Sequence, residues 1–362
     1  MIFFKKYLFK ILLSTLIILF LIIAPFPLFN KIMNLNYSLN SEYKLEYSGV
    51  FELWNVDTFE GGSLNRSAFL EKRSLEFEKI YRGVYFSIKS MTKEQLILNL
   101  ENGKKPDMIT YGIGVGEYIV DDLISLNSSY MIREDLIAGG KEKSQIKALP
   151  IMLGGYVLIT NKEQINCDNH LLKNITSYGK ELVYSSTEDI SPLFSLALND
   201  ISLKKQEIIN VDSFDAYDKF INEKYSILLG TQRDFYRCRN RESNLKMQCE
   251  YEFLSGYSDL IQYASIFKGD KRTETICEKF IEYLLSKNCQ KNLANIGMFP
   301  TISEIIYEDE KYKEFNEVLL KDLKTINIFT KNDDIKNLQS KLIDNVFNGN
   351  DNKKEILKYL CG

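Results

Sequence analysis

Between residues 49 and 88, the pattern of apolar and polar positions predicts a strand, a loop, a helix and a second strand, in that order. An apolar run at 50–54 precedes a polar loop, a charged periodic segment covers 66–80, and a second apolar run covers 84–88. This order predicts a βαβ unit. Its loop contains Gly61 and Gly62 at the carboxyl end of the first strand, where ligands bind in open α/β sheets. Glycine lets a backbone approach a ligand closely, although a tight turn without a ligand explains the same two residues equally well.

A second glycine-rich loop follows the third predicted strand, 106–110. A helix with a T-x-x-Q capping box at 92–95 leads into that strand. The loop reads YGIGVG, but Glu117 stands where a dinucleotide-binding fingerprint needs its third glycine, and the Lys-Ser/Thr of a P-loop is missing. We therefore interpret Gly112 and Gly114 as part of a backbone-lined loop beside the first one.

The middle of the chain repeats the alternation of strands and helices. Strands are predicted at 182–184 and 225–229, and helices at 192–198 and 213–221. A strand-like segment at 257–267 follows. Two aliphatic helix faces then predict a helical C-terminal part, with apolar side chains at Ile276, Phe280, Ile281, Leu284 and Leu285 and at Ile335, Leu338, Leu342 and Val346.

The N-terminus carries an export pattern. Lys5, Lys6 and Lys10 precede a nearly uninterrupted apolar run, 11–29, which is long enough to span a bilayer. Lysines before the run and few after it place the N-terminus inside and the rest outside. Because no small-residue cleavage site and no lipid-anchor cysteine follow, an uncleaved signal anchor is favoured over a cleaved signal peptide. The location expected is the outer face of the cell membrane, or the medium if the segment is cleaved.

Composition and charge exclude several classes of function. The formal net charge is −3 and no long basic run occurs, so a nucleic-acid partner is not expected. His170 is the single histidine, which leaves little basis for a zinc site, and we predict neither a metal nor a cofactor. No CxxC occurs among the six cysteines, and an exported location permits disulfides. Cys238 and Cys249 are the closest pair in sequence.

Six segments carry a resemblance to a known family. They are FELWNVDTFEGG, NGKKPDMITYGIGVGE, ALPIMLGGYVLITN, ILLGTQRDFYR, YSDLIQYASIF and CEKFIEYLLSKNCQKNLANIGMF, in this order from about Val50 to Phe299. In these segments the chain resembles the bacterial extracellular solute-binding proteins of ABC importers, in the family-one, maltose-binding-protein-like group. The resemblance implies an α/β fold of two lobes with hinge crossings, and an interlobe cleft that captures a solute, often a carbohydrate, for the transmembrane subunits of an ABC permease.

The expected organisation follows from this resemblance and from the strand and helix pattern. Residues 1–30 are the signal anchor or signal peptide and 31–45 a tether. Lobe one comprises 46–152 and 257–300, lobe two 153–256, and 301–362 form C-terminal helices that pack on the lobes. The extended segments 149–160 and 252–263 are the expected hinges. The chain departs from the family in lacking a lipobox cysteine or cleavable signal, and it has one tryptophan where many sugar binders stack several.

Candidate ligand contacts come from three loops. From the first loop we predict Trp54, Phe59, Glu60, Gly61 and Gly62, and from the second Gly112 and Gly114. From lobe two we predict Thr231, Gln232, Arg233 and Asp234, with Tyr184, Ser185 and Tyr257 as weaker candidates. Arg233 is suited to a bidentate clamp on a carboxylate or hydroxyl pair, but an ion pair with Asp234 explains it as well. Trp54 also fits a core position.

Two other classes of function stay open. Glu60, Asp57, Asp107 and Asp234 are carboxylates that a glycoside hydrolase would need in pairs, but their spacing places no two together, so no catalytic residue is predicted. A membrane-tethered sensor that uses the same binding fold is the second alternative, because an uncleaved anchor suits signalling to a membrane partner.

Overall fold

The computed structural model describes residues 48–59, 66–127, 131–165, 182–187, 189–199, 201, 203, 208–241, 247–303, 305, 307–321, 323–349 and 352–361. The predicted N-terminal anchor and tether lie outside these residues, as do Cys167 and His170. Within the part that is described, no helix is both long and apolar enough to cross a bilayer.

The first sheet has five strands in the order β2-β1-β3-β12-β6. They are β2 (Val84–Met91), β1 (Gly49–Val56), β3 (Met108–Tyr111), β12 (Ile261–Ile266) and β6 (Leu149–Leu153). β1 and β3 are parallel, with Leu53 opposite Met108, whereas β12 runs antiparallel to both β3 and β6. β1, α3 and β2 follow one another along the chain and the two strands are neighbours in the sheet, so the predicted strand–helix–strand unit is confirmed. The late strand β12 enters the middle of the sheet, a pairing that local patterning does not predict.

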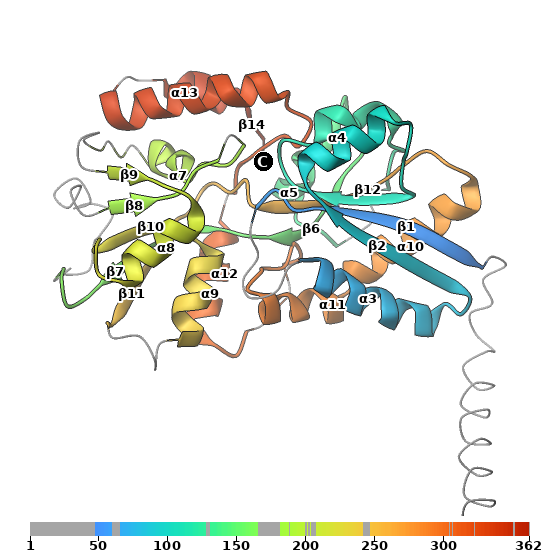
Figure 1. The fold of residues 1–362 in the computed structure, drawn as a ribbon, viewed down its shortest axis with the longest axis horizontal. Coiled ribbons are helices and arrows are strands. Elements are labelled where there is room, and N and C mark those ends of the chain that lie inside the picture. Colours follow the sequence, from blue (N-terminus) through green and yellow to red (C-terminus); the bar gives the residue numbers. More distant parts are fainter. Residues whose placement is uncertain are drawn as a thin grey trace, which may run out of the picture. The chain divides into compact units, whose positions relative to one another are not determined.

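Among the described residues, four helices lie beside this sheet (Figure 1): α3 (Arg66–Ile80), α4 (Lys93–Glu101), α10 (Lys271–Leu284) and α11 (Lys287–Lys291). Figure 1 shows α4 and α11 on opposite sides of its strands. The predicted capping box at the start of α4 is confirmed, because Thr92 and Gln95 each bond the other's backbone N–H. The predicted apolar face of α10 is buried, and the ring of Phe280 stacks on Phe86 with centroids 4.3 Å apart.

The end of α3 and the turn into β2 belong to a small unit of their own, whose described residues are 76–84 together with Ser48 and Gly49. The rings of Phe77 and Tyr81 lie 4.4 Å apart, and the N–H of Gly49 donates to the carbonyl of Gly83 at 2.9 Å. Gly83 has φ +92°, a conformation that glycine adopts at little cost.

The second sheet has the order β11-β7-β10-β8-β9. Its strands are β11 (Cys249–Phe253), β7 (Tyr156–Asn161), β10 (Ile227–Thr231), β8 (Leu182–Tyr184) and β9 (Ile208–Asn210). β8, β9 and β10 are mutually parallel, and β7 runs antiparallel to β10 and β11. Helices α7 (Leu193–Leu198), α8 (Ser213–Ile221) and α9 (Gln232–Arg241) belong to this lobe, where Figure 1 shows α8 and α9 beside β10.

Two extended crossings join the sheets, one from β6 to β7 and one from β11 to β12. They are bonded to each other, because the N–H of Gly154 donates to Leu260 and the hydroxyl of Ser258 donates to the carbonyl of Gly154 at 2.8 Å. A Cβ on Gly154 would lie 2.6 Å from the amide of Gln232, so the close approach requires glycine. The strand predicted at 257–267 begins only at Ile261, since the residues before it bond to the other crossing and to Lys324.

The C-terminal part contains α12 (Glu310–Leu319), α13 (Asn332–Asn348) and α14 (Lys353–Leu357). The predicted apolar face of α13 is buried and packs on α7, and Gly349 ends the helix with φ +68°. A two-stranded pair that the pattern did not predict, β13 (Thr325–Ile326) with β14 (Leu360–Cys361), also forms here. Shorter elements are η1 (Gly116–Tyr118), η2 (Val120–Asp122), α5 (Glu134–Ala138), β4 (Lys141–Glu142), β5 (Gln145–Ile146) and η7 (Asn292–Ile296).

Candidate binding cavity

A cavity of about 240 Å³ is lined by residues from both lobes. From the first lobe and the crossing come Thr58, Phe59 and Leu260; from the second lobe come Ser185, Thr187, Ile190, Ser213, Ala216, Leu228, Leu229, Gly230, Thr231, Arg233 and Asp234. The wall combines serine and threonine hydroxyls with aliphatic side chains, one aromatic ring, one guanidinium and one carboxylate. Such a mixture of apolar surface and a few polar groups is typical of a small-molecule site.

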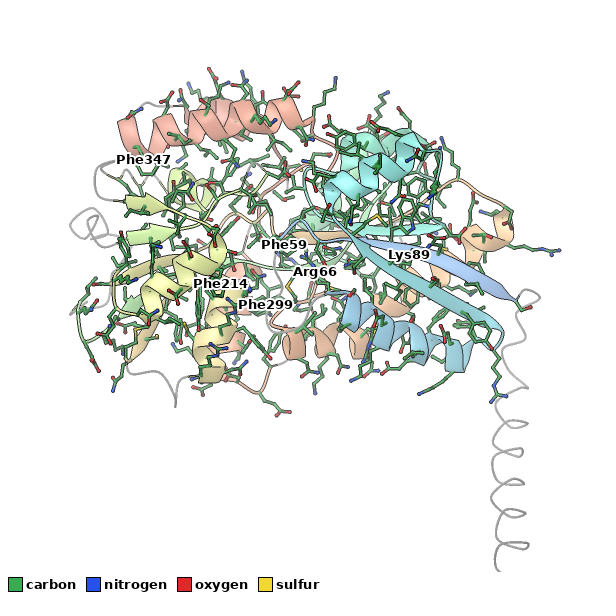
Figure 2. The ribbon with its side chains drawn as sticks, in the orientation of Figure 1. Phe59, Arg66, Lys89, Phe214, Phe299 and Phe347 are labelled. Atoms are coloured by element: carbon green, nitrogen blue, oxygen red, sulfur yellow. The ribbon has the colours of Figure 1, made fainter. Side chains whose placement is uncertain are left out.

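Arg66, the first residue of α3, holds the loop that carries Phe59. Its side chain is 1% exposed, and its Nε donates to the carboxylate of Asp57 at 2.9 Å. Its Nη2 donates to the carbonyl of Phe59, and the guanidinium carbon lies 3.9 Å from the centre of the Phe59 ring. Figure 2 shows the two side chains together. Burial lowers the pKa of Arg66, and the charge of Asp57 opposes this change. Arg66 thus fixes the ring that forms the cavity wall.

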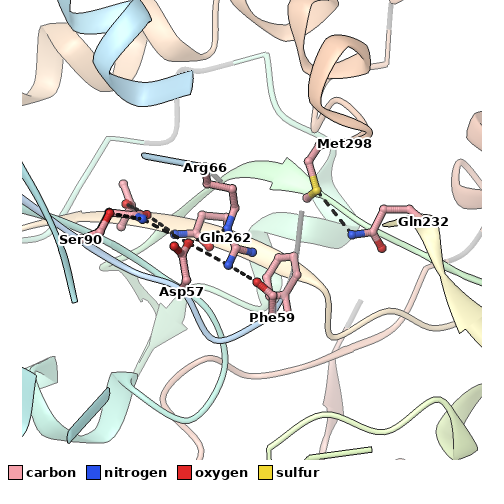
Figure 3. A network of polar contacts seen from close by, with 9 residues as sticks. Asp57, Phe59, Arg66, Ser90, Gln232, Gln262 and Met298 are labelled. Carbon is pink, nitrogen blue, oxygen red and sulfur yellow. Dashed lines mark hydrogen bonds and ion pairs between the residues drawn. The ribbon is translucent and has the colours of Figure 1, made fainter. Parts of the chain in front are cut away.

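A buried polar network connects this loop to the centre of the first sheet (Figure 3). The amide nitrogen of Asn55 donates to Asp57 at 3.1 Å and to the hydroxyl of Ser90 at 3.3 Å. The amide oxygen of Asn55 accepts from Thr110 at 2.9 Å and from Gln262 at 3.2 Å. Since Thr110 is in β3 and Gln262 in β12, the carboxyl end of β1 is held to two strands, which gives the loop a rigid base.

The opposite wall is the start of α9. The N–H of Thr231 donates to Asp234 at 2.9 Å, and the N–H of Arg233 donates to the hydroxyl of Thr231 at 3.2 Å, so these side chains cap the helix. Burial raises the pKa of Asp234, and the bond from Thr231 acts in the other direction. Burial and then the charge of Arg237 lower the pKa of Arg233 to about 10, whereas Asp234 raises it.

An ion pair joins the two lobes at the edge of this region. The ammonium of Lys93, at the start of α4, lies 2.9 Å from the carboxylate of Asp189 in the loop after β8, and both side chains are largely buried. The same carboxylate lies against Gly114, where an added Cβ would be 2.4 Å from it. Gly114 also has φ +89°. Both the positive φ and the contact with Asp189 therefore require glycine at this position.

The predicted ligand contacts are distributed unevenly around the cavity. Phe59, Thr231, Arg233 and Asp234 line it, and so does the weaker candidate Ser185. Glu60, Gly61 and Gly62 lie outside the described residues.

Four other candidates occupy positions away from the cavity wall. Gly112 packs against Thr58, since a Cβ there would lie 2.1 Å from the threonine hydroxyl oxygen, and Gly114 packs against Asp189. Gln232 is buried; its amide accepts from the N–H of Gly155 and donates to the sulfur of Met298. Trp54 is 3% exposed, with its indole N–H on Glu52 at 2.5 Å.

The two remaining weaker candidates are core residues. Tyr184 is buried in β8, and the hydroxyl of buried Tyr257 donates to Asp259 at 3.1 Å. Asp259 also accepts from Tyr156 and from the N–H of Ser191. Burial raises the pKa of Asp259 to about 6, and these hydrogen bonds act against that change.

Sequence reasoning missed several lining residues, including Thr58, Thr187, Ile190 and Ser213. Their shared signal is a small hydroxyl or aliphatic side chain in the segment between a strand and a helix or at the start of a helix. That signal is too common in sequences to identify a site by itself, and only the packing of the two lobes selects these positions.

The carboxylates needed by the hydrolase alternative are not paired among the described residues. Asp57 is bonded to Arg66, and Asp107 accepts from the N–H of Glu52 at the opposite end of the strands. Asp234 is the carboxylate that lines the cavity in the part of the chain that is described. There, too, no group of three or more His, Cys, Asp or Glu residues could hold a metal ion.

No protein-family profile matches the chain, and no curated protein sequence does. Its structure, however, resembles many solved ones. Maltose-bound MalE3 of T. maritima has a TM-score of 0.63 and 14% identity, over 85% of this chain and 97% of that one. The GacH receptor of Streptomyces glaucescens, solved with acarbose, has a TM-score of 0.59 and 13% identity over 83% and 94%.

Iron-bound HitA of Pseudomonas aeruginosa has a TM-score of 0.57 and 12% identity over 81% of this chain and 99% of that one. At such identities the likeness shows the fold alone. The chain has the two-lobe α/β fold of ABC substrate-binding proteins, as the resemblance in the sequence predicted, and the solved proteins named here bind solutes as different as a sugar and iron.

Proposed function

We propose that this protein captures a small solute in the cavity between the Phe59 loop and the start of α9 and delivers it to an ABC permease. The observation that carries the proposal is that one cavity is lined by residues from both lobes of a substrate-binding-protein fold. A solute that touches both lobes favours the closed arrangement by its differential affinity, and closure is the event that such a permease can recognise.

The chemistry of the wall favours a carbohydrate or a related polyol. Ser185 and Thr187 offer hydroxyls, which can both donate and accept hydrogen bonds. The hydroxyl oxygen of Thr58 is buried against Gly112 and is not counted among them. The ring of Phe59 offers a flat apolar face, and a sugar acid would add a carboxylate for Arg233. The structural neighbours that bind maltose and acarbose support this class.

The volume of the cavity limits the size of the solute. About 240 Å³ lies below the roughly 300–1,000 Å³ usual for drug-sized ligands. We therefore propose a solute of one or two sugar rings rather than a long oligosaccharide. Longer maltodextrins should bind at least tenfold more weakly than the best small solute.

The test is a thermal-shift screen of the full chain, extracted in mild detergent, against mono- and disaccharides, polyols and sugar acids. A specific solute raises the melting temperature by mass action. Ser185→Ala removes one hydroxyl from the wall and should reduce the shift. Lys313→Gln, on the exposed side of α12, is the matched control and should keep it. A library in which no compound raises the melting temperature would contradict the proposed site.

The location and the partner are part of the proposal. The apolar run at 11–29 supports retention of the N-terminal segment, so the intact mass of membrane-extracted protein should correspond to the uncleaved chain. A mature N-terminus between residues 30 and 40 would contradict the anchor. Copurification with ABC permease subunits supports transport, whereas copurification with a histidine kinase would favour the tethered sensor.

A further inference from the structure

The helix that forms one wall of the cavity also packs on β11, and aromatic rings mark the line of contact. The ring of Phe235 in α9 meets Tyr251 at 5.1 Å and Phe253 at 5.3 Å, both edge to face. Figure 1 shows α9 and β11 in the same lobe. Because side chains two residues apart share one face of a strand, the side chain at position 249 is on the face that receives α9.

The same geometry brings two cysteines together. Cys238 follows Phe235 by three residues, which is nearly one turn along the same helix face, and Cys249 precedes Tyr251 by two residues. The side chain of Cys249 lies within hydrogen-bonding reach of Cys238 and is the largest cause of the raised pKa of that thiol. Cys238 is fully buried, whereas Cys249, the first residue of β11, is partly exposed.

We propose that Cys238 and Cys249 form a disulfide that links α9 covalently to β11. Both residues are thiols in this structure, and the reaction needs a disulfide oxidant, either a thiol–disulfide oxidase or glutathione disulfide. The thiolate of Cys249, the more exposed of the two, attacks one sulfur of the oxidant and releases the other as a thiol. The thiolate of Cys238 then attacks the sulfur of Cys249 and releases the second thiol. Two cysteines are oxidised, one disulfide is reduced, and both protons end on the oxidant's thiols.

The interaction with Cys249, together with burial, raises the pKa of Cys238. The second attack in the folded protein is therefore slow, and the link forms most readily while the lobe folds. Once formed, it fixes α9, whose first turn lines the cavity with Arg233 and Asp234. The inference depends on the proposed extracellular location only for the source of the oxidant, and on the binding function not at all.

The experiment uses the full chain, purified in detergent and reduced, then unfolded and refolded with excess glutathione disulfide. After alkylation in denaturant, peptide mass mapping should find one joined pair, through Cys238 and Cys249, that is two hydrogens lighter than the separate peptides and separates on reduction. Cys277 and Cys361 should be alkylated. Alkylation of both Cys238 and Cys249, or a link from either to another cysteine, would overturn the proposal.

Two variants complete the test. Cys361→Ser should keep the joined pair, and Cys249→Ser should lose it. If Cys249→Ser does not fold, the melting temperature of the unaltered chain before and after reduction replaces it. The oxidised form should melt several degrees higher than the reduced form. Equal melting temperatures for the two forms would show that the disulfide does not stabilise the packing of α9 on β11. Because none of these measurements uses a solute, their failure is distinct from failure of the binding proposal.

Discussion

The buried carboxyl of Asp259 predicts a pH dependence that can be isolated by one substitution. Asp259 lies next to the crossing between the sheets and accepts hydrogen bonds from Tyr156, Tyr257 and the N–H of Ser191. Burial raises its pKa from 3.8 to about 6. Burial also raises the pKa of both tyrosines well above the ordinary value, so they stay neutral across the relevant range.

The sign follows from proton linkage. Because the pKa of Asp259 is higher in the folded than in the unfolded chain, the folded chain binds more protons between these two values. The stability associated with the neutral carboxyl is complete below about pH 4 and is lost as the pH rises through about 6. A change of this size corresponds to about 3 kcal/mol of unfolding free energy, as an order of magnitude.

The substitution Asp259→Asn removes this titration and keeps the shape of the side chain. Its amide oxygen can replace the carboxylate oxygen that accepts from Tyr257 and from the N–H of Ser191, while its amide nitrogen faces the hydroxyl of Tyr156 and can donate to it. The unfolding free energy of the variant relative to the parent should therefore rise by about 3 kcal/mol between pH 4 and pH 7.5.

Urea titrations at fixed pH, followed by the emission of the single tryptophan, measure this difference. Groups shared by both proteins cancel in the comparison. Asp121→Asn, at an exposed position in η2, is the control and should leave the difference flat. If the curves of Asp259→Asn and the parent run parallel between pH 4 and pH 7.5, the carboxyl is ionised in the folded protein throughout, and the argument from burial is refuted.

Three further predictions follow from the site. Arg66→Met should destabilise the chain by about 2 kcal/mol in urea titrations and weaken solute binding, since the ring of Phe59 loses its support; unchanged binding would contradict that role. Gly114→Ala should cost clearly more than Gly103→Ala, because both have positive φ but only the former would also collide with a carboxylate, and equal unfolding free energies would refute the collision. Because Trp54 is buried, its emission should resist quenching by acrylamide and change little when a solute binds. A large shift of the emission on binding would show that Trp54 does line the cavity.

The sequence alone predicted features that depend on neighbours along the chain. The capping box of Thr92 and Gln95, the apolar faces of α10 and α13 and the early βαβ unit all appear in the structure as the pattern indicated. Such features are set by contacts within a few residues and by the requirement that one face be buried. The six family-like segments indicated the two-lobe fold in a similar way. Each segment carries a local strand or turn pattern, and the segments occur in the same order as in the family.

The cavity wall depended on tertiary structure. Gln232 and Arg233 are adjacent in sequence, yet one amide is buried against the crossing and the other side chain lines the cavity. Trp54 and Phe59 were equivalent candidates in the first loop, but only Phe59 is held towards the cavity, by Arg66 from beyond the loop. A strand or helix pattern shows that a side chain faces one side of its element, but not what lies on that side. That neighbour is supplied by a segment distant in sequence, and only the folded chain brings the two together.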